Sequence, residues 1–336
     1  MRLSSLLIIA LMIAAGVSFL SCTGEAEEIH PLEIAPLFFG PPTHEYPFQG
    51  EMTEEKLARI LDNMQEDGIN MVLFLGGWGE KVYYPSEILK EPCSTDWYEI
   101  AFRMTAERNM EVVLPGVYYT YNDQFLGGRW DPQLDLDVNK KVYRELNERY
   151  GHHPNFWGWY IPHETGDRTH RGDIMVILGN LPPFLKALTP DKKVAHAPWF
   201  PSRITLGDEA LTPEETATEW DIMLGMIDGI DVYLFQDSTA PLDEVTDYYA
   251  AIKPVFDRHG AALWATIELF IRFQDRPGID LFKSISPELL FDKMAKASPY
   301  VEKFAIWEYQ THLDPDSNTP GAKELNAAYR EWLKSR

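Results

Sequence analysis

The chain has 336 residues, 45% of them hydrophobic, which is enough for one large barrel domain or two smaller domains. Its formal net charge of −22 argues against nucleic acid as a partner, because phosphate binding needs a basic surface. The ten tryptophans and sixteen tyrosines are expected mainly in the core, although their flat apolar faces also suit sugar rings.

Residues 1–21 are predicted to be a signal peptide. An apolar run over residues 3–20 follows Arg2, small residues interrupt it, and no charged segment stops transfer. The run ends in Phe19-Leu20-Ser21-Cys22, which resembles a bacterial lipoprotein box whose cysteine becomes the lipidated first residue. The alternative is an uncleaved N-terminal anchor. Apart from Cys22 only Cys93 remains, so the mature chain is not expected to contain an intramolecular disulfide.

Three acids follow the cysteine closely, Glu25, Glu27 and Glu28, and they resemble the acidic export signal of surface lipoproteins in the Bacteroidetes. We therefore expect residues 22–30 to form a lipidated linker. The exported protein would be anchored by lipid to the outer membrane, at the cell surface or on the periplasmic face.

From residue 34 onward, short apolar runs alternate with amphipathic stretches. The runs predicted as strands are Ile34–Phe39, Asn70–Leu75, Glu111–Val117, the stretch Asn155–Glu164 that ends in an acid, Lys193–Ala197, Asp231–Phe235, Ala262–Ile267 and Lys303–Ile306. The stretches predicted as helices are Thr53–Asp67, Asp96–Asn109, Asp137–Tyr150, Asp173–Leu188, Pro213–Ile227, Leu242–His259, Pro287–Ala297 and Lys323–Lys334.

Eight strand–helix units, with long connections after strands and short ones after helices, are typical of a (β/α)₈ TIM barrel. Nearly continuous apolar strands also fit a parallel sheet covered by helices. The alternative is a doubly wound open sheet, for which Gly40-Pro41-Pro42 is a poor phosphate turn. The units leave no chain for a second domain, so residues 31–336 are predicted to be one barrel.

The predicted strands carry almost no charge, whereas the residues just after them are polar or aromatic. Those named as candidates are His44, Trp78, Tyr119, Asn122, His163, Glu164, His196, Trp199, Gln236, Asp237, Glu268, Trp307 and Glu308. In a parallel barrel the C-terminal strand ends meet at one face, where the chemistry takes place. Single acids of this kind often cap the next helix, but the whole set indicates a site.

Glu164 and Glu268 follow the fourth and seventh predicted strands, and two carboxylates are what most glycosidases use. This placement resembles the large retaining glycosidase superfamily, with its acid/base on strand four and its nucleophile on strand seven. Trp307 after strand eight resembles the tryptophan that floors the sugar subsite there. One departure is that this superfamily usually has an asparagine before the acid/base, binding the sugar 2-hydroxyl, where this chain has His163.

Three stretches, Gly158–Glu164, Phe235-Gln236-Asp237 and Ile306-Trp307-Glu308-Tyr309, resemble the domain-of-unknown-function 4434 family, which are bacterial barrels, often lipoproteins. This family resemblance supports the fold and the address more than a reaction. The resemblance to the glycosidase superfamily implies a glycoside hydrolase acting on a poly- or oligosaccharide, with catalytic Glu164 and Glu268, and no cofactor is expected. The other candidate residues would then bind the sugar.

Two other functions remain open. One is a metal-dependent barrel hydrolase or isomerase with His163, Glu164, His196, Asp237 and Glu268 as ligands. The other is a carbohydrate-binding lipoprotein that has lost turnover. His152-His153 precedes the fourth strand, on the face away from this site, and is interpreted as structural.

If Cys22 carries lipid, the mature protein partitions into detergent, and replacing Cys22 with Ser releases it from membranes. Phase partitioning followed by mass spectrometry of the N-terminus measures both. A Cys22→Ser protein that stays membrane-bound at full length would show that the apolar run is an anchor.

Overall fold

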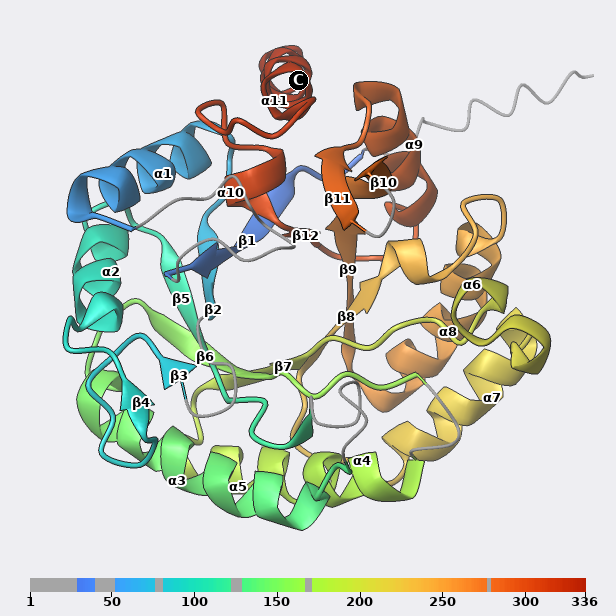
Figure 1. The fold of residues 1–336 in the computed structure, drawn as a ribbon. Helices are drawn as coiled ribbons and strands as arrows, with labels where there is room; N and C mark the ends of the chain where they lie inside the picture. Colours follow the sequence, from blue (N-terminus) through green and yellow to red (C-terminus); the bar gives the residue numbers. More distant parts are fainter. Residues whose placement is uncertain (1–28, 40–51, 76–80, 122–128, 167–170, 277–278) are drawn as a thin grey trace, which may run out of the picture.

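The computed structural model describes residues 29–39, 52–75, 81–121, 129–166, 171–276 and 279–336. Eight parallel strands close into a barrel in the order β1-β12-β9-β8-β7-β6-β5-β2, seen end-on in Figure 1. They are β1 (Leu32–Phe38), β2 (Met71–Leu75), β5 (Glu111–Pro115), β6 (Phe156–Ile161), β7 (Lys193–His196), β8 (Val232–Gln236), β9 (Ala262–Glu268) and β12 (Phe304–Trp307). The predicted single-domain (β/α)₈ barrel is confirmed, and the open sheet is excluded.

The helices form a ring outside the strands (Figure 1). They are α1 (Glu54–Glu66), α2 (Trp97–Ala106), α3 (Pro132–Tyr150), α4 (Arg171–Leu178), α5 (Leu181–Leu188), α7 (Pro213–Leu224), α8 (Val245–His259), α9 (Pro287–Ala297) and α11 (Ala322–Lys334). Several begin at the side-chain caps that the sequence indicates; Thr53, Asp96, Thr212 and Ser286 each accept a hydrogen bond from the first helical turn. No helix in the described part of the chain is long and apolar enough to cross a bilayer.

Some elements differ from the sequence prediction. The third helix begins at Pro132 rather than near Asp137, because Asp131 is its cap and proline suits the first helical position. The fourth predicted helix is two helices, α4 and α5, and the break at Gly179-Asn180 precedes the prolines. The small elements β3 (Lys81–Val82), β4 (Glu91–Pro92), α6 (Arg203–Leu206), α10 (Tyr309–His312) and the hairpin β10 (Phe270–Arg276)–β11 (Ile279–Ser284) were not predicted.

The core has two layers. A small one fills the barrel interior and includes Ile34, Met71, Tyr160 and Trp264, while a larger one lies between strands and helices. Gly158 is required by strand packing, because a Cβ there would collide with the backbone carbonyl of Lys193 on the neighbouring strand. The apolar, closely packed β6 therefore carries Glu164 to the mouth of the barrel as a rigid element.

A buried carboxylate joins the beginning of the chain to its end. Asp67, at the C-terminus of α1, is fully buried and accepts hydrogen bonds from Tyr309 Oη at 2.5 Å and Asn326 Nδ2 at 2.7 Å. It also pairs with the guanidinium of Arg330 on α11. Since α1 and α11 lie on neighbouring sides of the ring (Figure 1), this network closes the outer layer.

Asp67→Ala should lower the free energy of unfolding by about 3 kcal/mol, because it leaves the buried Tyr309 hydroxyl and Asn326 amide without this acceptor and removes one of the two carboxylates that Arg330 contacts. Urea unfolding followed by circular dichroism measures the loss. The matched control is Asp316→Ala, whose carboxylate lies 2.7 Å from Arg59 Nε with both side chains about half exposed. That exposed pair should cost less than about 1 kcal/mol. Equal losses would contradict the assignment.

Candidate active site

Glu164 lies just beyond β6, and its backbone is held from the neighbouring strand's loop. Tyr118 Oη donates to Pro162 O at 2.6 Å, and Tyr121 Oη donates to Glu164 O at 3.1 Å. The rings of these two tyrosines stack on each other at 5.2 Å. On the other side, the Trp199 amide donates to Thr165 O at 2.9 Å. The position of Glu164 is thus fixed from both flanking loops.

The Glu164 carboxyl is partly buried, and burial raises its pKa from the ordinary value of 4.5 to about 7. The Gln236 side chain, at the end of β8, hydrogen-bonds to this carboxyl and limits the rise in its pKa. Burial together with the charge of Glu164 raises the pKa of Tyr118 and of Tyr160 well above 10, so both phenols stay neutral donors. Glu164 therefore lies among neutral groups and can hold a proton near neutral pH.

Glu268 ends β9 and is held by groups from β8 and α9. Its amide donates to Asp237 Oδ1 at 3.0 Å, and its carbonyl accepts from Lys293 Nζ at 2.8 Å. Lys293 Nζ also lies 3.2 Å from Asp237 Oδ2 and 2.7 Å from Ser238 Oγ, and both charged side chains are buried. This buried ion pair fixes the backbone of Glu268.

Five influences set the pKa of Glu268. Burial and the charges of Asp237 and Glu164 raise it, while the Lys293 ammonium and a hydrogen bond to the Ser238 hydroxyl oppose them, leaving a pKa of about 7. Because Glu164 is one of the influences, the two carboxyls are close enough to interact. With a pKa of about 7 each, the two groups together hold about one proton near neutral pH.

Two tryptophans flank the pair. Trp307 is opposite Glu268 in the β12–β9 register, is partly exposed, and meets Phe38 edge to face at 5.5 Å. The peptide bond that follows it is cis. The backbone of Trp199 forms an isolated β-bridge with that of Gln236. The Trp199 ring packs directly on Gly166, where a side chain would collide with it. Both rings are thus placed beside the acids or their partners.

His163 is fully buried. Its Nε2 lies 3.4 Å from Asp135 Oδ1 on α3, and its ring is stacked against Trp130 and meets Tyr121 edge to face. In this structure the imidazole therefore fixes the strand end beside Glu164 and does not face the mouth. Its assignment as a sugar-binding residue stays a prediction.

Asp135 is the acceptor that organises this side of the mouth. It accepts from the backbone amides of Tyr119 and Thr120, the Thr120 hydroxyl, and Trp130 Nε1 at 2.7 Å. Burial raises its pKa, but His163 and these donors outweigh burial, so the pKa is lowered overall. The partly exposed Tyr119 is therefore fixed through its own backbone.

The remaining described candidates are buried. Glu308 is the cap of α10 and accepts from the amides of Gln310 and Thr311, each at 2.9 Å, so its carboxylate has the capping role that single strand-end acids often have. His196 Nδ1 lies 3.3 Å from Ile161 O, and burial lowers the pKa of His196 to about 3. Burial likewise lowers the pKa of His312 to about 3. Both imidazoles are neutral.

Four predicted residues, Cys22, His44, Trp78 and Asn122, lie outside the described part of the chain. Conversely, sequence reasoning missed Lys293, Asp135 and Ser238. Lys293 and Asp135 share a signal, because each occupies the buried face of its helix, with Leu290 and Met294 in α9 and with Leu136 and Val142 in α3. A charged residue on an apolar helix face indicates a buried partner.

The acids and histidines of the mouth do not form a metal site within the described residues. There, the one group of three or more whose ligand atoms converge is Glu99, His152 and His153, elsewhere in the molecule. A pocket of about 500 Å³ lies at the opposite, N-terminal ends of the strands, where Trp157, Lys193, Asp231 and Trp264 line it. Neither feature includes Glu164 or Glu268, so the mouth is the candidate active site.

The comparisons support the class of fold. A crystal structure from Bacteroides thetaiotaomicron VPI-5482, provisionally described as an alpha-L-fucosidase, is 23% identical, with a TM-score of 0.79 over 100% of this chain and 98% of that one. A beta-galactosidase from Halorubrum lacusprofundi is 11% identical, with a TM-score of 0.56 over 89% of this chain and 57% of the larger one. An intracellular xylanase from Thermoanaerobacterium saccharolyticum is 10% identical, with a TM-score of 0.50 over 84% and 87%. The fold is that of glycoside-hydrolase TIM barrels.

The chain belongs to the family described as Domain of unknown function (DUF4434), whose model matches residues 38–324. No curated protein gives a significant match.

The two acids should make stability depend on pH. Each has a folded pKa of about 7, above its ordinary 4.5, so the stability it contributes is complete below pH 4.5 and lost as pH rises through about 7. The double variant Glu164→Gln/Glu268→Gln should remove this loss, seen in urea unfolding at stepped pH. The control is Glu148→Gln/Glu331→Gln, two exposed sites that remove the same charge. Parallel curves for the wild type and the first double variant would contradict the pKa values.

Proposed function

We propose that the protein is a retaining glycoside hydrolase acting on a poly- or oligosaccharide. The observation that carries this is the pair Glu164 and Glu268 at the ends of the fourth and seventh barrel strands, both with a pKa of about 7. A pair holding about one proton offers one carboxylic acid and one carboxylate at the same pH. Those are the two forms that glycoside cleavage needs.

The surroundings of the two acids favour different roles. Glu164 has a neutral amide and phenols around it, so its protonated form is favoured and it acts as the acid that protonates the leaving oxygen. Glu268 has the Lys293 ammonium and the Ser238 hydroxyl beside it, which stabilise its ionised form for attack on the anomeric carbon against the opposing effects of burial and the Asp237 charge. In the second step Glu164 acts as the base that activates water.

The substrate would lie across the mouth with Trp307 as a platform. Trp307 neighbours Glu268 on the adjacent strand and is partly exposed, so a sugar ring stacked on it presents its anomeric carbon to that carboxylate. Trp199 and Gln236, beside Glu164, would contact the leaving group. The galactosidase and the xylanase, which share the fold, act on glycosides, which supports the substrate class and does not select a sugar.

We also propose that the protein is a lipoprotein anchored to the outer membrane through lipid on Cys22. The Cys22 box and the acids after it support this address.

A carbohydrate-binding protein without turnover is the second candidate. The burial of His163 favours it, because this position does not present a polar group to the mouth, where the related superfamily has a substrate-binding asparagine. Screening the protein against a glycan library separates the two functions. Product release supports hydrolysis, whereas glycan binding without product supports the second candidate.

Glu268→Ala should abolish turnover on every substrate that the screen identifies. Glu164→Ala should reduce turnover of substrates with poor leaving groups by roughly 10²–10⁴-fold, the usual contribution of a general acid, and spare activated aryl glycosides. Azide should rescue Glu164→Ala by attacking the glycosyl-enzyme, and NMR of the early product should show a retained anomeric configuration. Full activity in both variants would disprove the pairing and make Asp237 the next candidate.

A further inference from the structure

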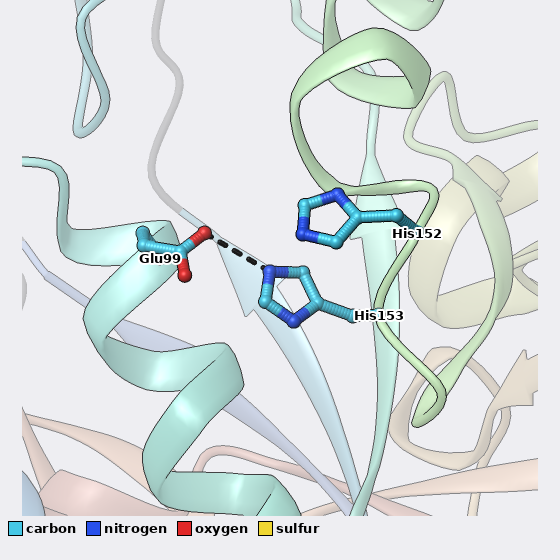
Figure 2. A group of neighbouring side chains, drawn as sticks. All are labelled: Glu99, His152 and His153. Carbon is cyan, nitrogen blue, oxygen red and sulfur yellow. Dashed lines mark hydrogen bonds and ion pairs between the residues drawn. The ribbon is translucent and has the colours of Figure 1, made fainter.

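We propose that Glu99, His152 and His153 form a zinc-binding site on the outside of the barrel. Figure 2 shows the two imidazoles, from the turn between α3 and β6, beside the carboxylate of Glu99 on α2. One ligand atom from each residue can be chosen so that all lie within 4.8 Å of one another. Glu99 Oε2 already lies 3.0 Å from His153 Nε2.

His153 is held in place before any metal binds. Its ring stacks on Phe102, one turn after Glu99 on α2, with the ring centres 4.4 Å apart and the planes 5° from parallel. Its backbone amide donates to Tyr150 O, and Tyr150 Oη donates to Asp96 Oδ1, the cap of α2, at 2.7 Å. The turn that carries both histidines is thus already fastened to the helix that carries the carboxylate.

The donor set suits zinc. Two imidazole nitrogens and a carboxylate oxygen are common zinc ligands, bound at about 2.0–2.2 Å in tetrahedral geometry. Ligand atoms around such a centre are roughly 3.3 Å apart, by geometry from those bond lengths. The Glu99–His153 contact already meets this spacing, and the exposed Glu99 and His152 can rotate to close the rest. The fourth position would hold water.

A similar pair elsewhere lacks this chemistry. His259 Nε2 lies 2.7 Å from Asp221 Oδ1, but the same oxygen is 2.9 Å from Arg258 Nη2. The Arg258 guanidinium thus lies beside His259, where His152 lies beside His153, and its positive charge repels zinc. His259 is therefore a matched control, because it too pairs an imidazole with a carboxylate in a comparable contact.

The site is separate from the proposed active site. His152 and His153 precede β6 and Glu164 follows it, so the whole length of that strand lies between them. Zinc here would join α2 to the α3–β6 turn and stabilise the fold, because a ligand that binds only the folded chain raises its stability. It would take no part in cleavage of a sugar bond.

The test is calorimetric titration of the metal-free full chain with zinc chloride, with cobalt(II) spectra to identify the ligands. We expect one zinc per chain, a higher melting temperature with zinc, and a tetrahedral cobalt spectrum without a thiolate band, which excludes Cys93. His152→Ala, His153→Ala and Glu99→Gln should each weaken binding at least tenfold, and His259→Ala should leave it unchanged. The His153→Ala variant loses the stack on Phe102 and could be destabilised. His152 is exposed, so the His152→Ala variant should remain folded in either case.

Three outcomes would overturn the proposal. The first is the absence of zinc binding by the wild type, and the second is unchanged zinc affinity in His152→Ala and Glu99→Gln. The third is zinc binding that is lost in Glu164→Gln or Glu268→Gln and kept in the surface variants. That result would place the metal in the barrel mouth and favour the metal-dependent hydrolase.

Discussion

The cost of removing two carboxyl groups from water is the constraint on which this structure depends. Glu164 and Glu268 lie at the ends of strands whose other residues are almost all apolar, and burial is the largest influence on the pKa of each. A lone buried carboxylate would be costly, so the surrounding loops and helices supply donors to both. Closure of the barrel is what brings the fourth and seventh strand ends near enough for one charge to act on the other.

The groups that compensate for burial differ between Glu164 and Glu268. Around Glu164 the groups are neutral: the Gln236 amide donates to its carboxyl, and the ionisation of the nearby phenols of Tyr118 and Tyr160 is suppressed. Near Glu268 the groups are charged, because Lys293 reaches in from α9 to meet Asp237 and the Glu268 carbonyl. Neutral surroundings favour a proton on Glu164, and a nearby ammonium favours its departure from Glu268.

Periodicity and strand-end chemistry were sufficient to predict the barrel and the position of its paired acids. Eight apolar runs of strand length became the eight barrel strands, because tertiary packing and local preference agree there. The β10–β11 hairpin was missed because it interrupts the expected alternation of strand and helix. The roles of Lys293 and Asp135 were missed because strand-end reasoning does not search helix faces. Glu308 was predicted to bind the substrate because it follows a strand, but its carboxylate caps the helix α10 that comes next.

The burial of His163 changes which group can hold the sugar hydroxyl next to the scissile bond. An asparagine at this position would present an amide to the mouth, whereas His163 turns toward Asp135 and joins β6 to α3. Compared with an asparagine, His163 fixes the end of β6 more firmly but offers no polar contact to the mouth. Among the described residues, Gln236 is the amide that hydrogen-bonds to the Glu164 carboxyl. In the proposed function, Gln236 is therefore the described residue best placed to make the contact that an asparagine would make.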